Sequence, residues 1–201
     1  VHDHSLDESS VGSPVAVSGW EEWSGIGRWI GDSSAPVRIV VFGDYECPYC
    51  TQFDSAFRTL RDSVGDAVSL LHVHFPLSYH KWALPAAQIA ECAAEQGLFG
   101  EMHSLLYQEQ RRTPTERRSW QQLVSQLGPG LREDVFAGCM STERALARIS
   151  RGRELGDSLG VSSTPTILIN GFLYPALSAE HLSAEFAKHF EAARTGGSWS
   201  S

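Results

Sequence analysis

The chain has 201 residues, of which 42% are hydrophobic and 20% are charged. That composition is typical of a globular protein with one large domain, or a smaller domain carrying an insertion. Its 16 basic and 24 acidic residues give a formal net charge of −8, which argues against nucleic acid as a partner because phosphate contacts need a basic surface. No apolar run in the sequence approaches the roughly 18 residues that a membrane-spanning helix needs.

The N-terminal 18 residues are rich in Ser, Asp, Gly and Pro and show no periodicity. We therefore expect a flexible leader or linker over 1–18. The chain begins with Val1 instead of Met, as it would after removal of a secretion signal. The next segment carries Trp20, Trp23 and Trp29, which we expect to pack it onto the domain, with a short edge strand as one form it could take.

A strand, a helix and a second strand are predicted around the first two cysteines. Residues 37–42 (VRIVVF) are a near-continuous β-branched run, typical of a buried central strand. Apolar residues at helical spacing follow and stop at Gly65. Over 68–75 (VSLLHVHF) the alternation predicts a strand with His72 and His74 on a polar face. The two cysteines therefore lie at the start of the helix between these strands.

A block of helices is predicted next, over 82–96, 98–110, 115–127, 131–139 and 141–159. We expect His80, just before this block, to border a groove, and His103 within it to be structural. In the last helix Gly152, Gly156 and Gly160 fall four residues apart. An interior helical glycine costs about 1 kcal/mol relative to alanine, so this spacing suggests that another element approaches closely.

The C-terminal part returns to strands. Residues 166–170 (TILIN) and 172–174 are joined by the hairpin signal Asn170-Gly171, and a final helix covers 178–194. The order β–α–β, helices, β–β–α predicts an α/β fold in which two halves close into one sheet around a helical insertion. The expected parts are a leader (1–18), an α/β domain (19–77 and 161–195), an inserted all-helical subdomain (78–160) and a flexible tail (196–201).

Cys47 and Cys50 are separated by two residues, a spacing shared by zinc sites and redox-active dithiols. Structural zinc needs four ligands, typically from two CxxC or CxxH pairs, but Cys92 and Cys139 stand alone in predicted helices. A structural disulfide between Cys47 and Cys50 would close a very short loop and would restrict the unfolded chain only slightly. We therefore favour redox chemistry and expect no metal; a non-enzymatic zinc-binding module is the least favoured alternative.

The position of the dithiol at a helix start has a chemical consequence. Unpaired backbone N–H groups and the helix dipole stabilise an anion there, so Cys47 would form the nucleophilic thiolate. Pro48 suits the first helical turn, where its missing N–H costs nothing. Cys50, deeper in the helix, would resolve a mixed disulfide formed by Cys47.

Two motifs together resemble the DsbA-like branch of the thioredoxin-fold thiol–disulfide oxidoreductases: Cys47-Pro48-Tyr49-Cys50 and Thr164-Pro165. The stretches AAQIAECAAEQGLFGEMHSLLY and LGVSSTPTILING also look like this branch, and the resemblance covers roughly residues 20–192. It implies a thioredoxin fold with an inserted helical subdomain and a cis Thr164–Pro165 bond. In the family this loop lies against the reactive sulfur and pairs with an extended substrate segment.

The other two cysteines are open to two interpretations. Free cysteines are often small buried apolar residues. Some members of the family, however, carry a structural disulfide at similar places in the helical insertion, so the resemblance implies a Cys92–Cys139 bond. Four cysteines are also an even count, as expected in an oxidising compartment.

The sequence departs from the family pattern near the dithiol. Many thioredoxin-fold enzymes have a buried acid six residues before the first cysteine, where this chain has Val41. Asp44 and Glu46 are closer to the motif and are the candidates to replace it, although Glu46 is more simply read as a solvated loop residue. The strongest oxidants of the family have His where this chain has Tyr49, so we expect a potential below about −120 mV.

These observations predict a protein thiol–disulfide oxidoreductase, acting as an oxidase in an extracytoplasmic compartment, periplasmic or in the cell envelope, and tethered in one scenario through a missing N-terminal segment. The alternatives are a disulfide isomerase or reductase and a glutathione-dependent, glutaredoxin-like enzyme. The expected partners are cysteine-containing proteins and, at the family level, a membrane redox partner for recycling. We expect a monomer that needs no cofactor beyond the Cys47–Cys50 disulfide.

Overall fold

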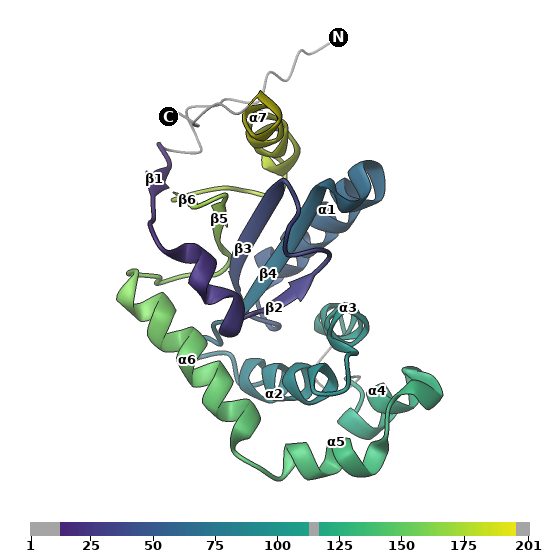
Figure 1. Ribbon diagram of the computed structural model, residues 1–201. Coiled ribbons are helices and arrows are strands. Elements are labelled where there is room, and N and C mark those ends of the chain that lie inside the picture. Colours follow the sequence, from purple (N-terminus) through teal and green to yellow (C-terminus); the bar gives the residue numbers. More distant parts are fainter. Residues whose placement is uncertain (1–12, 113–116, 196–201) are drawn as a thin grey trace.

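A mixed six-stranded sheet forms the centre of the protein in a computed structural model that describes residues 13–112 and 117–195 (Figure 1). The strands lie in the order β1-β6-β5-β3-β4-β2. Central strand β3 pairs in parallel with β4 and antiparallel with β5, and the remaining pairs are antiparallel. The strand bounds are β1 Val15–Ala16, β2 Arg28–Ile30, β3 Val37–Gly43, β4 Val68–His74, β5 Thr166–Ile169 and β6 Phe172–Tyr174.

Seven α-helices accompany the sheet in the described part of the chain. Helix α1 connects β3 to β4 and α7 follows β6, while α2–α5 gather at one end of the sheet and α6 runs back from them toward β5 (Figure 1). Their bounds are α1 Pro48–Val64, α2 Ala83–Ala94, α3 Phe99–Gln110, α4 Trp120–Gln126, α5 Glu133–Met140, α6 Arg144–Ser158 and α7 Leu182–Thr195. The helical insertion predicted between the two sheet halves is therefore present.

The alternating side chains of β3 join two hydrophobic layers. Ile39 and Val41 pack with apolar residues of α1 and α7, whereas Val40 and Phe42 pack with the tryptophans of the N-terminal segment and with Phe75. Because both faces are covered, the strand is apolar throughout, as its sequence predicted. A third apolar cluster fills the helical subdomain and reaches Cys47 and Cys50, so the dithiol lies where the subdomain meets the sheet.

The structure differs from the sequence prediction in the N-terminal segment, at β4 and at the starts of α4 and α7, the last of which begins at Leu182 instead of 178. The leader predicted over 1–18 ends earlier, since β1 pairs with β6 at the sheet edge; residues 1–12 and the predicted tail 196–201 lie outside the described part. His72 and His74 do not form an exposed polar face but are buried, because α3 covers that side of β4 with residues such as His103. Helix α4 begins at Trp120 instead of 115, because Ser119 forms a capping box with Gln122.

The glycine spacing in α6 has a packing cause at two of its three positions. A Cβ atom at Gly152 would lie 2.7 Å from the carbonyl oxygen of His74, and one at Gly156 would lie 2.5 Å from the ring of Phe75. Both are too close for a real Cβ, so α6 can approach β4 and the following Phe75 this closely only with glycine at these positions. Gly160 has a different role: its φ of 74° turns the chain after the helix.

Candidate active site

The dithiol lies at the first turn of α1. Cys47 is the N-cap residue and Pro48 is the first helical residue, the arrangement that the sequence predicted. Both cysteines are free thiols. Cys47 is only 4% exposed and Cys50 only 1%, so the expected contrast between an exposed and a buried sulfur is small. Pro48 and Tyr49 are the exposed members of the motif.

A loop from the far end of the chain covers Cys47. The Thr164–Pro165 peptide bond is cis, as the resemblance implied, and the Cys47 thiol donates to the carbonyl oxygen of Thr164 at 3.1 Å. This contact explains why Cys47 is less exposed than its position at a helix start suggests. Beside the loop is a hollow of about 200 Å³ whose lining includes Tyr49, Phe53, Thr164, Pro165 and Leu177.

The two thiols have opposite ionisation behaviour. The pKa of Cys47 is lowered from 9.0 to about 6, chiefly by a hydrogen bond from the Cys50 thiol, against the opposing effect of burial. The Thr164 hydroxyl and the backbone N–H groups of Tyr49 and Cys50 lower it further. Burial raises the pKa of Cys50 well above its usual value. Near neutral pH the pair therefore holds a thiolate at Cys47 and a thiol at Cys50.

We expect the reactivity of reduced Cys47 to rise with a midpoint near pH 6. The rate of carbamidomethylation by iodoacetamide, followed by peptide mass, should reach half its plateau there, because only the thiolate reacts. Since the folded pKa is depressed, the thiolate stabilises the reduced folded protein above the unfolded thiol pKa of about 8.5, and this contribution is lost as the pH falls through about 6. A midpoint near pH 9 for Cys47 would contradict the assigned environment.

The two carboxylates of the loop before Cys47 hold a neighbouring segment in place. Asp44 is 1% exposed; its Oδ2 accepts from the backbone N–H of Leu77 and contacts His80 Nδ1, both at 2.8 Å. Glu46 Oε2 accepts from the backbone N–H of Trp82 at 2.6 Å, so it is not a free solvated residue. His80, expected to border a groove, is the ion-pair partner of Asp44. Val41, at the position of the family acid, is buried in β3.

A series of buried hydrogen bonds stabilises the same loop from the side of α3. The Tyr45 hydroxyl donates to His103 Nδ1 at 2.9 Å, and His103 Nε2 donates to Asp54 Oδ1 at 3.0 Å. Burial lowers the pKa of His103 and raises that of Tyr45, which keeps the imidazole neutral and the hydroxyl protonated. The Oδ2 atom of Asp54 in turn accepts a hydrogen bond from Arg58 Nε at 2.7 Å. The motif loop, α3 and α1 are thus tied together beneath the dithiol.

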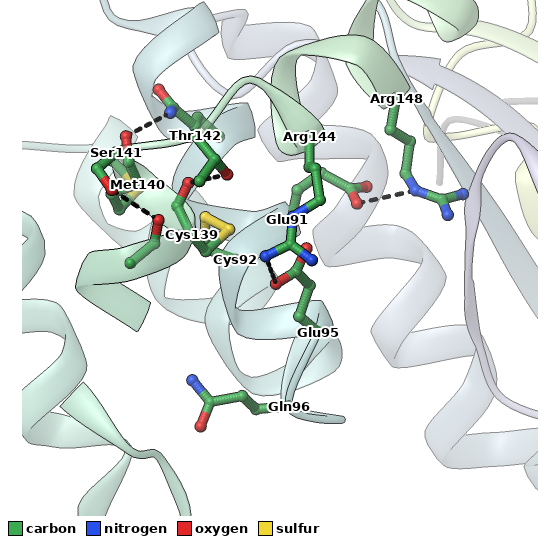
Figure 2. The surroundings of a disulfide bond; sticks show 12 residues. Glu91, Cys92, Glu95, Gln96, Cys139, Met140, Ser141, Thr142, Arg144 and Arg148 are labelled. Atoms are coloured by element: carbon green, nitrogen blue, oxygen red, sulfur yellow. Dashed lines mark hydrogen bonds and ion pairs between the residues drawn. A yellow bond between two sulfur atoms is a disulfide. The ribbon is translucent and has the colours of Figure 1, made fainter. Parts of the chain in front are cut away.

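Cys92 of α2 and Cys139 of α5 are joined in a disulfide, with 5.6 Å between their Cα atoms (Figure 2). Both residues are buried in the core of the helical subdomain. Adjacent Glu91 is also buried, and its carboxylate makes ion pairs with Arg28 at 2.6 Å and Arg148 at 3.2 Å. The Cys92–Cys139 disulfide therefore lies within the insertion, next to an ion-pair network that links α2 to β2 and α6.

Sequence reasoning missed the partners of the acids around the motif. The Asp44–His80, Tyr45–His103 and Glu46–Trp82 contacts connect residues far apart in sequence. Among the described residues, no three or more His, Cys, Asp or Glu side chains are grouped so that they could hold a metal ion. No helix in that part of the chain is long and apolar enough to span a membrane.

Comparison with known proteins places this geometry in a family. The family model described as thioredoxin matches residues 24–186. Over 170 residues, or 82% of this chain, the sequence is 37% identical to the Na(+)/H(+) antiporter NhaA 3 of Salinispora tropica, of which the match covers 25%. The chain thus spans about a quarter of the length of the curated relatives that it matches.

Solved structures share the fold at low sequence identity. BdbD from Bacillus subtilis, in its oxidised form, superposes with a TM-score of 0.70 and 20% identity over 90% of this chain and 97% of that one. Wolbachia pipientis alpha-DsbA1 gives a TM-score of 0.68 and 17% identity over 85% and 94%. These similarities confirm the predicted fold class, a thioredoxin fold with an inserted helical subdomain.

Proposed function

Because the chain belongs to the thioredoxin family, we propose that it is a thiol–disulfide oxidoreductase that acts on cysteine-containing proteins through Cys47 and Cys50. The observation that carries this proposal is the state of Cys47. Its thiol lies at a helix N-terminus against the cis Thr164–Pro165 loop, with a pKa of about 6. The names of the structural relatives, which include a thioredoxin-like oxidoreductase from Silicibacter pomeroyi, support the same chemistry.

The proposed reaction uses the oxidised protein, in which Cys47 and Cys50 share a disulfide. A substrate thiolate attacks Cys47 Sγ, the Cys47–Cys50 bond breaks, and the Cys50 thiolate takes up a proton. A second substrate thiolate then attacks the substrate sulfur of this mixed disulfide and releases Cys47 as a thiolate. The substrate gains a disulfide by losing two electrons and its thiol protons, and the protein is left as the dithiol.

Oxidation is the proposed direction because the site stabilises the reduced protein. A thiolate of low pKa is a good leaving group, and its stabilisation favours transfer of the disulfide to the substrate. Around the two cysteines, we propose that Pro48 shapes the start of α1 and that Tyr49 contacts the substrate. Thr164 and Pro165 form the loop that pairs with the substrate. Isomerase, reductase and glutathione-dependent activities remain the alternatives that the test below separates.

We propose an extracytoplasmic location, supported by the Cys92–Cys139 disulfide, a bond that persists in oxidising compartments. Similarity to proteins named as Na(+)/H(+) antiporters favours a site of action beside a membrane. On this proposal the domain works as a monomer, and a membrane-bound redox partner reoxidises Cys47 and Cys50. The redox-active disulfide is the only group that the chemistry requires.

The direction is tested by equilibrating the protein in glutathione buffers and counting Cys47 and Cys50 thiols by trapping and mass. We expect a midpoint between about −120 and −200 mV, the range of known oxidants and isomerases. A midpoint near about −270 mV, as in thioredoxin, would identify a reductase. Reduction of a glutathione–protein mixed disulfide faster than oxidation of a reduced protein would instead favour the glutaredoxin-like alternative.

A further inference from the structure

A second hollow, of about 610 Å³, has Glu46 in its lining. Its walls are the aromatic side chains of Tyr79 and Trp82, three cationic side chains and the Glu46 carboxylate; the cations are Lys81, Arg117 and Arg118. We call it the basic–aromatic pocket. Because Glu46 directly precedes Cys47, the pocket begins within one residue of the proposed nucleophile.

Hydrogen bonds hold one wall of the pocket, the segment that carries Tyr79 and Lys81, against the loop that precedes Cys47. Glu46 accepts from the backbone N–H of Trp82, and Asp44 binds both the N–H of Leu77 and the His80 ring. These bonds fix both ends of the segment that carries Tyr79 and Lys81. Tyr79 is nevertheless 71% exposed, so its aromatic ring is presented to solvent on this wall. An exposed aromatic ring on a segment anchored at both ends is suited to binding at low entropic cost.

The pocket carries more positive charge than its own residues neutralise. Arg118 is occupied by Glu109 through a bond from its Nε at 2.7 Å, and Arg117 reaches Glu46 only at 3.6 Å. The Arg117 guanidinium lies over the Trp82 ring at 4.6 Å, and its Nε has no hydrogen-bond partner among the described residues. Within the same part of the chain, Lys81 makes no ion pair.

This local positive charge is unusual in a chain with a formal net charge of −8. A carboxylate is the group that best satisfies such donors, because arginine and lysine form charge-assisted hydrogen bonds to it. The Tyr79 and Trp82 rings would pack against the methylene groups that carry the carboxylate. Because its Glu46 wall directly precedes Cys47 in the chain, a protein segment whose cysteine reacts at Cys47 can extend to this pocket.

We propose that the basic–aromatic pocket binds an acidic side chain flanking the reacting cysteine of a protein substrate, which makes it a specificity site of the oxidoreductase. This inference rests on the proposed function and adds a substrate class to it. The residue assigned to recognition is Lys81, with the Arg117 guanidinium as the second donor. The Glu46 and Asp44 carboxylates act as positioning groups, since they hold the wall of the pocket.

The test compares two reduced peptides that each contain one cysteine pair and differ only in two Glu or two Gln residues flanking the first cysteine. Their oxidation by the disulfide form of the protein is followed by thiol trapping. Each rate is divided by the peptide's rate with a small aromatic disulfide, because a nearby carboxylate also changes the ionisation of the peptide thiol. We expect the normalised rate to be about fivefold higher for the Glu peptide at low ionic strength, the scale of one partly exposed ion pair.

Lys81→Gln should bring the two normalised rates closer together, since only Arg117 then remains as a donor, while the Gln peptide is oxidised as before. Arg151→Gln is the matched control, because it removes the same charge from an exposed residue of α6 that does not line the pocket. Equal normalised rates with the unaltered protein would overturn the inference and leave the proposed function intact. Equal loss of preference in both variants would also overturn it. Failure to oxidise either peptide would overturn the proposed function itself.

Discussion

A Cys50→Ala variant is expected to accumulate as a mixed disulfide with protein substrates through Cys47. In the reduced variant the Cys47 thiolate can still attack a substrate disulfide, but no second thiol of the protein is placed to release it. Catalysed oxidation of a reduced substrate should fall by about 10³-fold or more, the scale on which loss of a reacting group acts. The adduct is measured by non-reducing electrophoresis and by mass after incubation with a substrate that contains disulfides.

Cys47→Ala provides the matched control for this experiment. It removes the sulfur that contacts Thr164, and the remaining thiol, Cys50, is only 1% exposed in the unaltered protein, so the variant should form no adduct and show the same loss of turnover. An adduct through Cys50 in this variant would reverse the assigned roles of the two cysteines. Retention of full turnover by Cys50→Ala would show that a thiol outside the motif resolves the intermediate.

Cys50→Ala also removes the largest influence on the Cys47 pKa. The hydrogen bond from the Cys50 thiol is the first cause of the shift to about 6, whereas the Thr164 hydroxyl and the helix N–H groups persist in the variant. The pKa of Cys47 should therefore rise without returning fully to 9.0. Two functions of Cys50, resolution and stabilisation of the thiolate, can thus be separated by the adduct and by the pH profile of alkylation.

The parts of the fold that the sequence predicted are those with local causes. The strand at 37–42 is apolar because both of its faces are covered, and the helix after Cys47 shows its periodicity and its N-terminal Pro48 directly. The hairpin that joins β5 to β6 follows from the local signal Asn170-Gly171. The cis bond before Pro165 is different, since only the resemblance indicated it.

What the sequence did not show depends on contacts between distant segments. Strand β1 has two residues, and only pairing with β6 makes it a strand. His72 and His74 look like a polar sheet face until α3 covers them. Asp44 was identified as a candidate to replace the buried acid of the family, but its partner His80 lies 36 residues away. No periodicity marks such a pair, because each member follows the pattern of its own segment.

The bonds around Asp44 and Glu46 link the two proposals. Asp44 Oδ1 accepts from the N–H of Glu46, and Oδ2 contacts Leu77 and His80, so both carboxylate oxygens help to hold the loop. Its geometry is that of a residue that fixes a loop. The position six residues before Cys47 holds Val41, so the acids of this site lie beside the motif, where they shape the surface that meets substrate.

Removal of the Cys92–Cys139 disulfide is expected to lower the free energy of unfolding by about 4 kcal/mol, because the bond closes a long loop between α2 and α5. The two cysteines are 47 residues apart and both are buried, so the Cys92→Ala, Cys139→Ala double variant avoids a lone thiol and a buried polar group. Urea unfolding of the double variant and the unaltered protein, both with Cys47 and Cys50 oxidised, isolates this bond. The slope against urea should rise modestly as the unfolded chain expands.

The same double variant shows whether the Cys92–Cys139 disulfide affects only the stability of the protein or also the ionisation of Cys47. The disulfide joins helices of the subdomain core, while the Cys47 environment is built by Cys50, Thr164 and the first turn of α1. We therefore expect the alkylation midpoint of Cys47 to stay near pH 6 in the folded double variant, although the protein unfolds at lower urea. A stability change below about 1 kcal/mol would mean that the subdomain restricts the unfolded chain without the bond. A shifted Cys47 midpoint would show that α2 transmits the state of the second disulfide to the active site.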